Sequence, residues 1–273
     1  MIRLVAMDLD GTLFNSKRQV DLMTQAVIRR YAKSGVIFAF CTGRISNELQ
    51  DVITILPEVQ YAISCNGAYA VDLWSGKELY QNTLSMEDVN RIYQHFSGFP
   101  MMFELFADGV VLTDQNCLNY LAQFQLRELE GHIRKTRKGV PDFADYLKER
   151  TDPVGKINIF FAGQEILLKA REWGKQLPYD MAYQTKSNLE FNQIGVKKGK
   201  GLAHLAQRLG ISKSQVLAIG DNNNDLSMRE AVGTLVAMEN ACEDLKKIAN
   251  LVTASNDADG VAVALKQFLP PLE

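Results

Sequence analysis

Three strongly apolar segments, separated by helical patterns, constrain the fold of the first 66 residues more than any other feature. Residues 2–7, 36–41 and 61–65 are each short and almost continuously apolar, as strands buried on both faces are. Between them, residues 21–33 place apolar side chains at helical spacing, and residues 45–56 form a second helical pattern that ends before a proline. This order predicts a parallel sheet covered by helices on both faces.

The pattern changes after residue 68 and returns at residue 198. The intervening stretch combines hairpin, helical and short strand patterns, at residues 68–80, 85–96, 101–113, 115–130, 157–162, 164–176, 181–183 and 189–191. Helical patterns then alternate again with apolar strands, at residues 198–209, 216–219, 224–231, 235–238 and 260–269. The sequence therefore predicts an α/β fold with a Rossmann-like parallel-sheet core, residues 1–82 and 189–273, and an inserted α+β domain at residues 83–188.

The charge balance and the apolar runs exclude several classes of partner. The chain has 30 Lys and Arg against 32 Asp and Glu, so it lacks the basic surface that nucleic acid or an anionic membrane requires. Its longest unbroken apolar run, residues 36–41, is far shorter than the roughly 20 residues that span a bilayer. The apolar segment before Asp8 is too short for a signal peptide. We expect a cytoplasmic protein with no nucleic acid, membrane or obligate protein partner.

Cysteine and histidine are too scattered to suggest a zinc site or a histidine-based triad. The four cysteines include no CxxC pair, and in a chain of this length without a predicted export signal they are expected to be free, buried thiols. The three histidines are equally dispersed. A basic cluster at residues 134–138 has two interpretations, a solvated surface or a binding patch for an anionic substrate tail, and the sequence favours the first.

Polar clusters directly follow three of the predicted buried strands. They are Asp8-Leu9-Asp10-Gly11-Thr12, Thr42-Gly43-Arg44 and Gly220-Asp221-Asn222-Asn223-Asn224-Asp225. The carboxyl ends of parallel strands line one crevice, so these distant segments are expected to converge there. Ordinary turns also favour Asp, Asn and Gly, so no single cluster is decisive. The combination is more specific, because a string with four fixed positions occurs by chance about 0.002 times in such a chain.

The residue types in these clusters are suited to phosphoryl transfer. Asp8, Asp10 and Asp221 concentrate negative charge, and an all-oxygen set of ligands favours Mg²⁺. A carboxylate beside Mg²⁺ can attack phosphorus and form an aspartyl-phosphate. A second carboxylate two residues further on can exchange a proton with the leaving oxygen. Hydroxyl, amide and lysine donors could bind the phosphoryl oxygens, although a lysine such as Lys198 at a helix start is by itself commonly a surface residue.

These segments, together with Lys198-Gly199, resemble the four ordered motifs of the haloacid dehalogenase superfamily of phosphohydrolases. Three further segments resemble its Cof-like branch, namely Cys65-Asn66-Gly67-Ala68, Val236-Ala237-Met238-Glu239-Asn240-Ala241 and Asp259-Gly260-Val261-Ala262. That branch carries a large α/β cap, of the C2B type, between its second and third motifs. The resemblance covers the whole chain, including the position of the insert.

The resemblance implies a Mg²⁺-dependent phosphatase that hydrolyses small phosphate monoesters, such as sugar phosphates or similar metabolites, through an aspartyl-phosphate. Asp8 would be the nucleophile and Asp10 the general acid and base. The metal would be bound by Asp8, Asp221 and the backbone carbonyl of Asp10. The remaining implied roles are phosphate binding by Leu9, Thr42, Gly43, Lys198 and Asn224, and support of the last loop by Asp225. The roles of Arg44 and Asn66 stay unassigned.

Three other functions share parts of this chemistry. A phosphomutase or phosphotransferase would form the same aspartyl-phosphate and pass the group to a sugar. A phospho-accepting signalling domain also places acids and a lysine at strand ends. It requires a phosphoenzyme that hydrolyses slowly, however, and both the insert and the positioned Asp10 argue against such a domain. An ion-pumping ATPase would need membrane helices, which the sequence does not predict.

Overall fold

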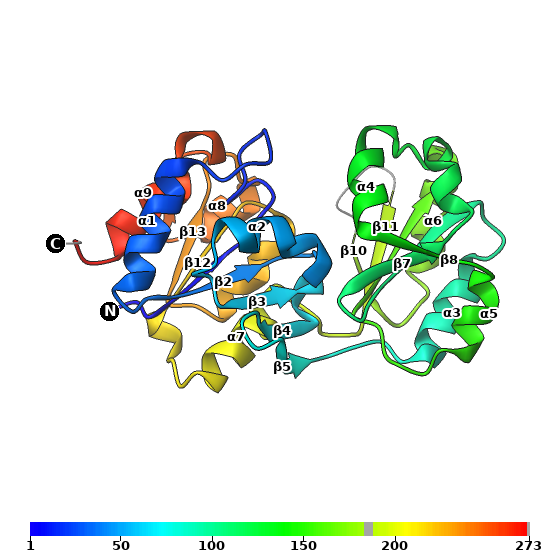
Figure 1. Ribbon diagram of the computed structural model, residues 1–273, viewed down its shortest axis with the longest axis horizontal. Coiled ribbons are helices and arrows are strands. Elements are labelled where there is room, and N and C mark those ends of the chain that lie inside the picture. Colours follow the sequence, from blue (N-terminus) through cyan, green and yellow to red (C-terminus); the bar gives the residue numbers. More distant parts are fainter. Residues whose placement is uncertain (183–187, 272–273) are drawn as a thin grey trace. The chain divides into compact units, whose positions relative to one another are not determined.

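The computed structural model describes residues 1–182 and 188–271, and the chain divides into two compact units (Figure 1). Unit 1 comprises Met1–Arg44, Leu49–Gln81 and Lys197–Glu273, and unit 2 comprises Ile45–Glu48 and Asn82–Val196. Unit 2 continues past the predicted boundary at residue 188, because strand β11 (Asn188–Asn192) pairs with β9 (Lys156–Phe161) of the same unit.

Unit 1 is built on an eight-stranded sheet. Its strand order is β14 (Leu251–Val252), β13 (Thr234–Ala237), β12 (Val216–Gly220), β1 (Leu4–Met7), β2 (Ile37–Cys41), β3 (Tyr61–Ser64), β4 (Tyr69–Asp72) and β5 (Lys77–Gln81). Neighbouring strands from β14 to β3 are parallel, and β4 and β5 add an antiparallel hairpin. The predicted α/β fold with a parallel-sheet core is therefore confirmed.

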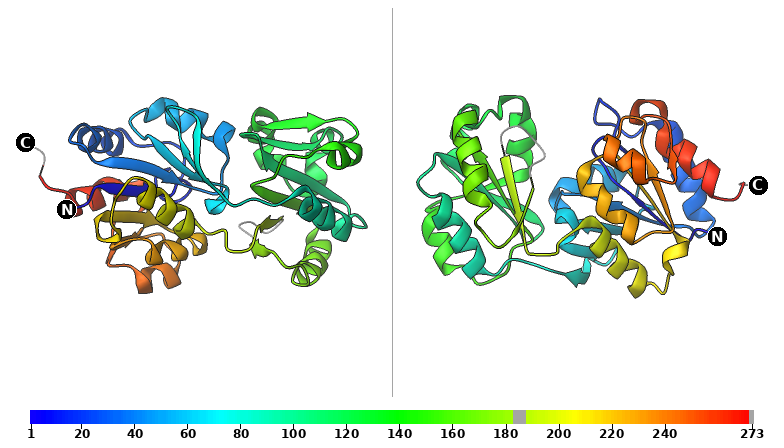
Figure 2. Two further views of the ribbon diagram at one scale, coloured as in Figure 1. Left: turned by 90° about the horizontal axis from the view of Figure 1, so that it is seen from below. Right: turned by 180° about the vertical axis from the view of Figure 1, so that it is seen from behind.

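Helices cover both faces of this sheet (Figure 2). The α-helices of unit 1 are α1 (Leu22–Lys33), α2 (Gln50–Ile55), α7 (Lys198–Arg208), α8 (Glu243–Ile248) and α9 (Gly260–Phe268). Helix α1 packs beside α9, while α7 packs against β3, β4, β5 and the 3₁₀ helix η7 (Asn223–Glu230). Shorter 3₁₀ turns of unit 1 are η2 (Cys65–Gly67), η6 (Lys213–Gln215) and η8 (Asn256–Ala258), whereas η1 (Ser46–Leu49) lies in unit 2 except for Leu49. Strands β1, β2 and β12 are almost wholly buried between these layers.

Unit 2 contains a six-stranded sheet in the order β10 (Asp180–Ala182), β11, β9, β6 (Met101–Ala107), β7 (Val110–Asp114) and β8 (Arg137–Val140). Its pairs are antiparallel except for β7 and β8. One face packs apolar side chains against α3 (Met86–Phe96), α5 (Phe143–Glu149) and α6 (Gln164–Gly174). Ser85 caps α3 as predicted, and Tyr183, at the end of a predicted strand, lies outside the described residues.

Two predicted α-helices are wholly or largely 3₁₀ segments. The predicted helix at 115–130 is three short turns, η3 (Cys117–Asn119), η4 (Leu121–Phe124) and η5 (Arg127–Leu129), followed by α4 (Glu130–Thr136). Gln125 interrupts it with a left-handed backbone, at φ 61°. The predicted helix at 224–231 is η7, whose N-terminus is closed by a capping box in which Asp225 accepts from Asn222 N–H at 3.0 Å. The predicted helix at 45–56 begins as η1 before α2.

A row of buried polar residues occupies the other face of the unit 2 sheet. Glu104, Asn158 and Glu190 lie opposite one another on β6, β9 and β11. Arg137 donates to Glu104 Oε1 at 2.8 Å and to Glu48 Oε1 at 2.6 Å, and its side chain is 7% exposed. The solvated-surface interpretation of residues 134–138 is therefore wrong for Arg137, because β8 turns this side chain toward two carboxylates.

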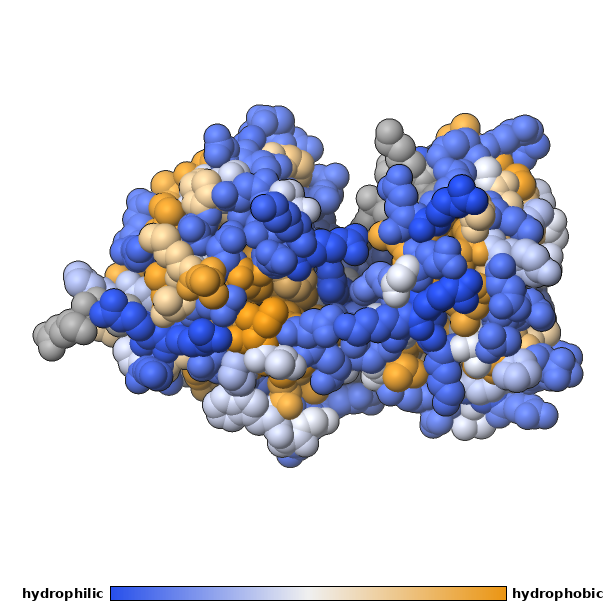
Figure 3. Space-filling model, turned by 45° about the horizontal axis from the view of Figure 1, so that its top comes forward, coloured by the Kyte–Doolittle hydropathy of each residue, from blue (hydrophilic) through white to orange (hydrophobic). Residues whose placement is uncertain are grey.

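On the face drawn in Figure 3, hydrophilic side chains predominate in each unit, with smaller apolar patches between them. The four cysteines are free, as predicted, but only Cys41 and Cys65 are buried, whereas Cys117 and Cys242 are partly exposed. Within residues 1–182 and 188–271, no helix combines the length and the apolar character that crossing a membrane would need.

Candidate active site

The polar clusters predicted from the sequence lie at the ends of adjacent strands of unit 1. Asp8 follows β1, Thr42 follows the neighbouring β2, and Asp221 follows β12 on the other side of β1. The register aligns Met7 with Phe40 and with Ile219, so the residues after all three strands leave the sheet at the same edge. Buried parallel strands therefore position these side chains together, as expected at the carboxyl edge of such a sheet.

A buried lysine joins two of the carboxylates. Lys198 begins α7, is 1% exposed, and donates from Nζ to Asp8 Oδ1 at 2.6 Å and to Asp225 Oδ1 at 2.7 Å. The other oxygen of Asp225 accepts from the backbone N–H groups of Asp221 and Asn222, at 2.9 and 3.0 Å. Lys198 is thus not a surface lysine, and Asp225 holds both the lysine and the loop that follows β12.

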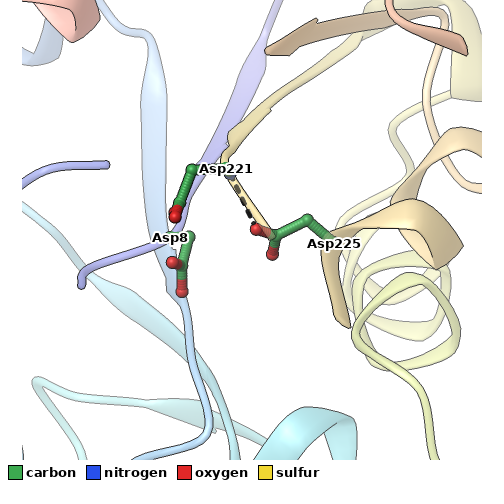
Figure 4. A group of neighbouring side chains, drawn as sticks. All are labelled: Asp8, Asp221 and Asp225. Atoms are coloured by element: carbon green, nitrogen blue, oxygen red, sulfur yellow. Dashed lines mark hydrogen bonds between the residues drawn. The ribbon is translucent and has the colours of Figure 1, made fainter. Parts of the chain in front are cut away.

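Asp221 completes a compact acidic group with Asp8 and Asp225 (Figure 4). One carboxylate oxygen from each of the three residues lies within 4.8 Å of the others. Thr12 orients Asp221 by donating from Oγ1 to its Oδ1 at 2.7 Å. Gly11, with φ +84°, lies where any Cβ would collide with the Asp221 carboxylate, so the turn after β1 requires glycine for close approach.

Burial makes ionisation of these carboxylates costly. Desolvation raises the pKa of Asp8 well above its usual value; Asp225 and Asp221 add to the rise, while Lys198 opposes it. Desolvation also raises the pKa of Asp221, against the hydrogen bond from Thr12. Desolvation would lower the pKa of Lys198, but Asp225 and Asp8 outweigh it and the pKa is raised. A permanently charged ammonium therefore faces three carboxylates, whose excess negative charge favours a bound cation.

The donor set fits a hard divalent cation such as Mg²⁺. Asp8 and Asp221 offer carboxylate oxygens, and the described group contains no sulfur or imidazole ligand. Asn224, on the same loop, has a buried Oδ1 with no hydrogen-bond partner among the described residues. An orphaned buried amide is costly unless a ligand completes it, so its position beside the acidic group is consistent with a binding site.

The segment after β2 is held by a turn of unusual backbone geometry. Cys65, Asn66 and Gly67 all have positive φ angles, and the first two are not glycine. Their conformation lets Cys65 N–H donate to Arg44 O and Asn66 N–H donate to Thr42 O, both at 3.0 Å. The turn thus fixes the backbone around Thr42 and Gly43, where the sequence predicts phosphate-binding donors.

Asp10 lies apart from the acidic group. Its side chain is 55% exposed and forms a salt bridge with Arg44. Asp8 and Asp10 therefore come from one turn but experience different environments, one buried beside a lysine and the other facing solvent.

Several contributing residues had no predicted role. Besides Thr12, Asn240 donates to Gly11 O at 2.8 Å, and Ser227 Oγ accepts from Gly199 N–H at 3.1 Å. Gly199 lies so close to the Ser227 backbone that a Cβ would collide with it, which explains glycine after Lys198. Thr12, Asn240 and Gly199 belonged to recognisable motifs, but only the folded arrangement shows what each contacts.

Comparisons with known proteins agree with this geometry. The family model for haloacid dehalogenase-like hydrolases matches residues 5–265, and the chain belongs to this family. Among curated relatives, Phosphatase YwpJ of Bacillus subtilis is 28% identical, over 98% of this chain and 100% of its own length. Pyridoxal phosphate phosphatase YbhA of Escherichia coli is 26% identical, over 95% of this chain and 96% of its own.

A solved structure resembles the whole chain as well. The crystal structure of a haloacid dehalogenase-like hydrolase from Bacteroides thetaiotaomicron has a TM-score of 0.86 at 28% identity, covering 98% of this chain and 100% of that one. The predicted family is confirmed, and this protein is an enzyme, a phosphatase of the haloacid dehalogenase family.

Proposed function

We propose that this phosphatase depends on Mg²⁺ and hydrolyses small phosphate monoesters through an aspartyl-phosphate formed on Asp8. The observation that carries the proposal is the buried bridge of Lys198 between Asp8 and Asp225, beside the Asp221 carboxylate. Each of these groups is costly to bury alone, and together they are suited to a dianionic substrate and its counter-ion.

The metal ligands would be Asp8, Asp221 and the backbone carbonyl of Asp10. When bound, Mg²⁺ supplies positive charge that offsets the repulsion between a carboxylate nucleophile and an anionic phosphate. Thr12 keeps Asp221 oriented through its 2.7 Å hydrogen bond. Lys198, anchored by Asp225, holds Asp8 in place and neutralises charge on the phosphoryl oxygens.

Hydrolysis would proceed in two steps, formation of the aspartyl-phosphate and its hydrolysis. In the first, an Asp8 oxygen attacks phosphorus, the bond from phosphorus to the ester oxygen breaks, and Asp10 gives its proton to the leaving alcohol. In the second, Asp10 takes a proton from water as the water oxygen attacks phosphorus, and the bond to Asp8 breaks to release phosphate. The exposed position of Asp10 gives it access to both the leaving group and water.

The phosphoryl oxygens would be bound by donors at the edge of the sheet. We assign this role to the Leu9 backbone N–H, the Thr42 hydroxyl, the Gly43 N–H, Lys198 and the Asn224 amide. Two observations support the assignment. The turn at Cys65–Gly67 fixes the backbone around Thr42. The buried Asn224 Oδ1 has no partner among the described residues and is an acceptor, so a cation or a donor would complete it, which leaves Nδ2 to donate to a phosphoryl oxygen.

Unit 2 would act as a cap that selects the ester. The core supplies common chemistry on short turns, and curated relatives matched over nearly their full length carry names with different substrates, among them pyridoxal phosphate. The buried polar row of Glu104, Asn158 and Glu190 is paired within unit 2, with Arg137, Asn188 and Lys156, so it stabilises the sheet and does not identify the ester. The expected substrate is a sugar phosphate or similar metabolite. We expect the enzyme to act on such metabolites in the cytoplasm, without an obligate macromolecular partner.

Phosphate release by Asp8→Asn tests the proposal. The variant should fold like the wild type and lose turnover, since amide nitrogen or oxygen cannot replace the carboxylate nucleophile. Asp51→Asn, an exposed change in the same unit, is the matched control and should keep full activity. A few per cent of wild-type activity in folded Asp8→Asn would contradict the assignment. Release of free phosphate, and not an isomerised sugar phosphate, separates the phosphatase from a phosphomutase.

A further inference from the structure

The carboxylate of Asp10 forms a two-bond fork with Arg44. Arg44 Nε donates to Asp10 Oδ2 at 2.9 Å, and Arg44 Nη2 donates to Asp10 Oδ1 at 2.5 Å. Both carboxylate oxygens are thereby engaged by one planar guanidinium, which fixes the plane of the carboxyl group as well as its position. A half-exposed aspartate without such a partner would sample several side-chain rotamers.

Arg44 is itself anchored on two sides. Its backbone N–H donates to Thr42 Oγ1 at 3.2 Å, and its carbonyl accepts from Cys65 N–H at 3.0 Å. Its guanidinium carbon lies 5.1 Å from the ring centre of the buried Phe14. Phe14 belongs to the same turn as Asp10, with which it forms an isolated β-bridge. The fork therefore connects the phosphate-binding segment to the turn that carries Asp10.

We propose that Arg44 is a positioning residue that orients the Asp10 carboxyl group for proton transfer. This inference rests on the proposed function, in which Asp10 protonates the ester oxygen as the phosphorus–oxygen bond breaks and its electron pair moves to that oxygen. General acid–base catalysis contributes roughly 10²- to 10⁴-fold, and only when the acid lies within hydrogen-bond reach of the leaving atom. Arg44 maintains that geometry and does not itself exchange a proton, because a guanidinium stays protonated.

The rival role for Arg44 is direct binding of the substrate phosphoryl group, for which arginine is well suited. The structure favours positioning, because Nε and Nη2 both face Asp10 and the Phe14 ring supports the guanidinium on that same turn. The two roles differ in what they predict for esters with different leaving groups. A good leaving group departs without a proton, whereas an alkoxide needs one.

The experiment compares kcat/KM for p-nitrophenyl phosphate with that for the alkyl phosphate on which the wild type is most active. Since kcat/KM reports steps up to loss of the leaving group, it isolates the acid role from later hydrolysis. The variants are Arg44→Gln, Arg44→Lys, Asp10→Asn and the double variant Arg44→Gln/Asp10→Asn. Arg29→Gln is the matched control, because Arg29 is a partly exposed arginine of unit 1 paired with Glu58. Thermal unfolding confirms that each variant is folded.

We expect Arg44→Gln to lower kcat/KM about 10-fold or more for the alkyl ester and less than about 3-fold for p-nitrophenyl phosphate, the pattern of a weakened general acid. Arg44→Lys should be intermediate, because an ammonium keeps the charge but cannot form the fork. The double variant should be no slower than Asp10→Asn alone, because Arg44 acts through Asp10. Arg29→Gln should match the wild type.

Two results would overturn the inference while leaving the phosphatase proposal intact. Equal losses for both esters, or losses that multiply in the double variant, would mean that Arg44 contacts the substrate itself. Unchanged kinetics in folded Arg44→Gln would mean that the fork plays no part in proton transfer. Failure of the wild-type enzyme to release phosphate from any ester would instead refute the proposed function, and the role of Arg44 with it.

Discussion

Replacing Lys198 with methionine should reduce both stability and activity, because Lys198 is the cation shared by two buried carboxylates. Asp225 is fully buried and the Asp8 side chain is 8% exposed, so neither can recover solvation when the ammonium is removed. Removing one partner of a buried ion pair costs about 3–5 kcal/mol, and methionine keeps most of the side-chain volume, so packing adds little. At about 2–4 °C per kcal/mol for a unit of this size, the melting temperature should fall by about 10 °C.

Activity should fall together with stability in Lys198→Met. One charged donor of an electrostatic pocket is worth about 10²–10³ in turnover. The assays are thermal unfolding followed by circular dichroism, without metal and with Mg²⁺, and phosphate release at a temperature where the variant is folded. Lys200→Met is the matched control, since Lys200 lies on the same helix but is exposed.

A double variant separates lost charge pairing from a general packing defect. Lys198→Met/Asp225→Asn removes one of the two stranded carboxylates and should regain part of the lost melting temperature. The reasoning is refuted if Lys198→Met has the same melting temperature as Lys200→Met and keeps the wild-type kcat/KM. It is also refuted if the double variant is less stable than Lys198→Met. Replacing the Asp225 carboxylate would then cost more free energy of unfolding than leaving its charge unpaired.

Three further predictions follow from individual contacts. Burial would raise the pKa of Glu48, but His132 and Arg137 outweigh it and lower that pKa from 4.5 to about 2. The stability that Glu48 contributes is therefore complete above pH 4.5 and is lost as the pH falls toward 2. The difference in unfolding free energy between wild type and Glu48→Gln, measured in urea at several pH values, should therefore shrink over that window, and a pH-independent difference would contradict the ion pair. Thr12→Val removes the hydrogen bond to Asp221 and should raise the Mg²⁺ concentration for half-maximal activity by about 10- to 100-fold, with Thr12→Ser near wild type; an unchanged requirement would exclude this role. Ca²⁺ should inhibit the Mg²⁺-supported reaction, because its larger coordination number lets it engage Asp8 through both oxygens, and turnover supported equally by Ca²⁺ would argue against Asp8 as a ligand and nucleophile.

The core could be predicted from the sequence because its strands leave strong local signals. Strands β1, β2 and β12 are buried on both faces, so each is a continuous apolar run, and the polar residues that follow mark the edge of the sheet. The 3₁₀ segments could not be predicted in the same way. The capping box of Asn222 and Asp225 marks where η7 begins, but neither it nor the apolar spacing distinguishes a 3₁₀ helix from an α-helix.

The site was predictable in its motifs but not in its pairings. Thr12 and Asp221 are hydrogen-bonded across 209 positions of sequence, and no periodicity relates them. Arg44 belonged to a predicted cluster, yet its fork with Asp10 depends on the approach of two turns. A run of basic residues indicates a solvent-facing surface, and it does not show that the partner of Arg137 is Glu104, which lies 33 positions earlier on β6, two strands away in the same sheet.

The most direct test of this account is to trap the phosphoryl group on the enzyme. Asp10→Asn mixed with excess p-nitrophenyl phosphate and Mg²⁺ should form the phosphoenzyme, because this leaving group needs no acid, and should hydrolyse it slowly, because the base is gone. After acid quenching, peptide mass spectrometry should locate one phosphoryl group on Asp8, and Asp8→Asn should carry none. A burst of p-nitrophenol from Asp10→Asn without label, or label on another residue, would contradict the claim that Asp8 is the nucleophile.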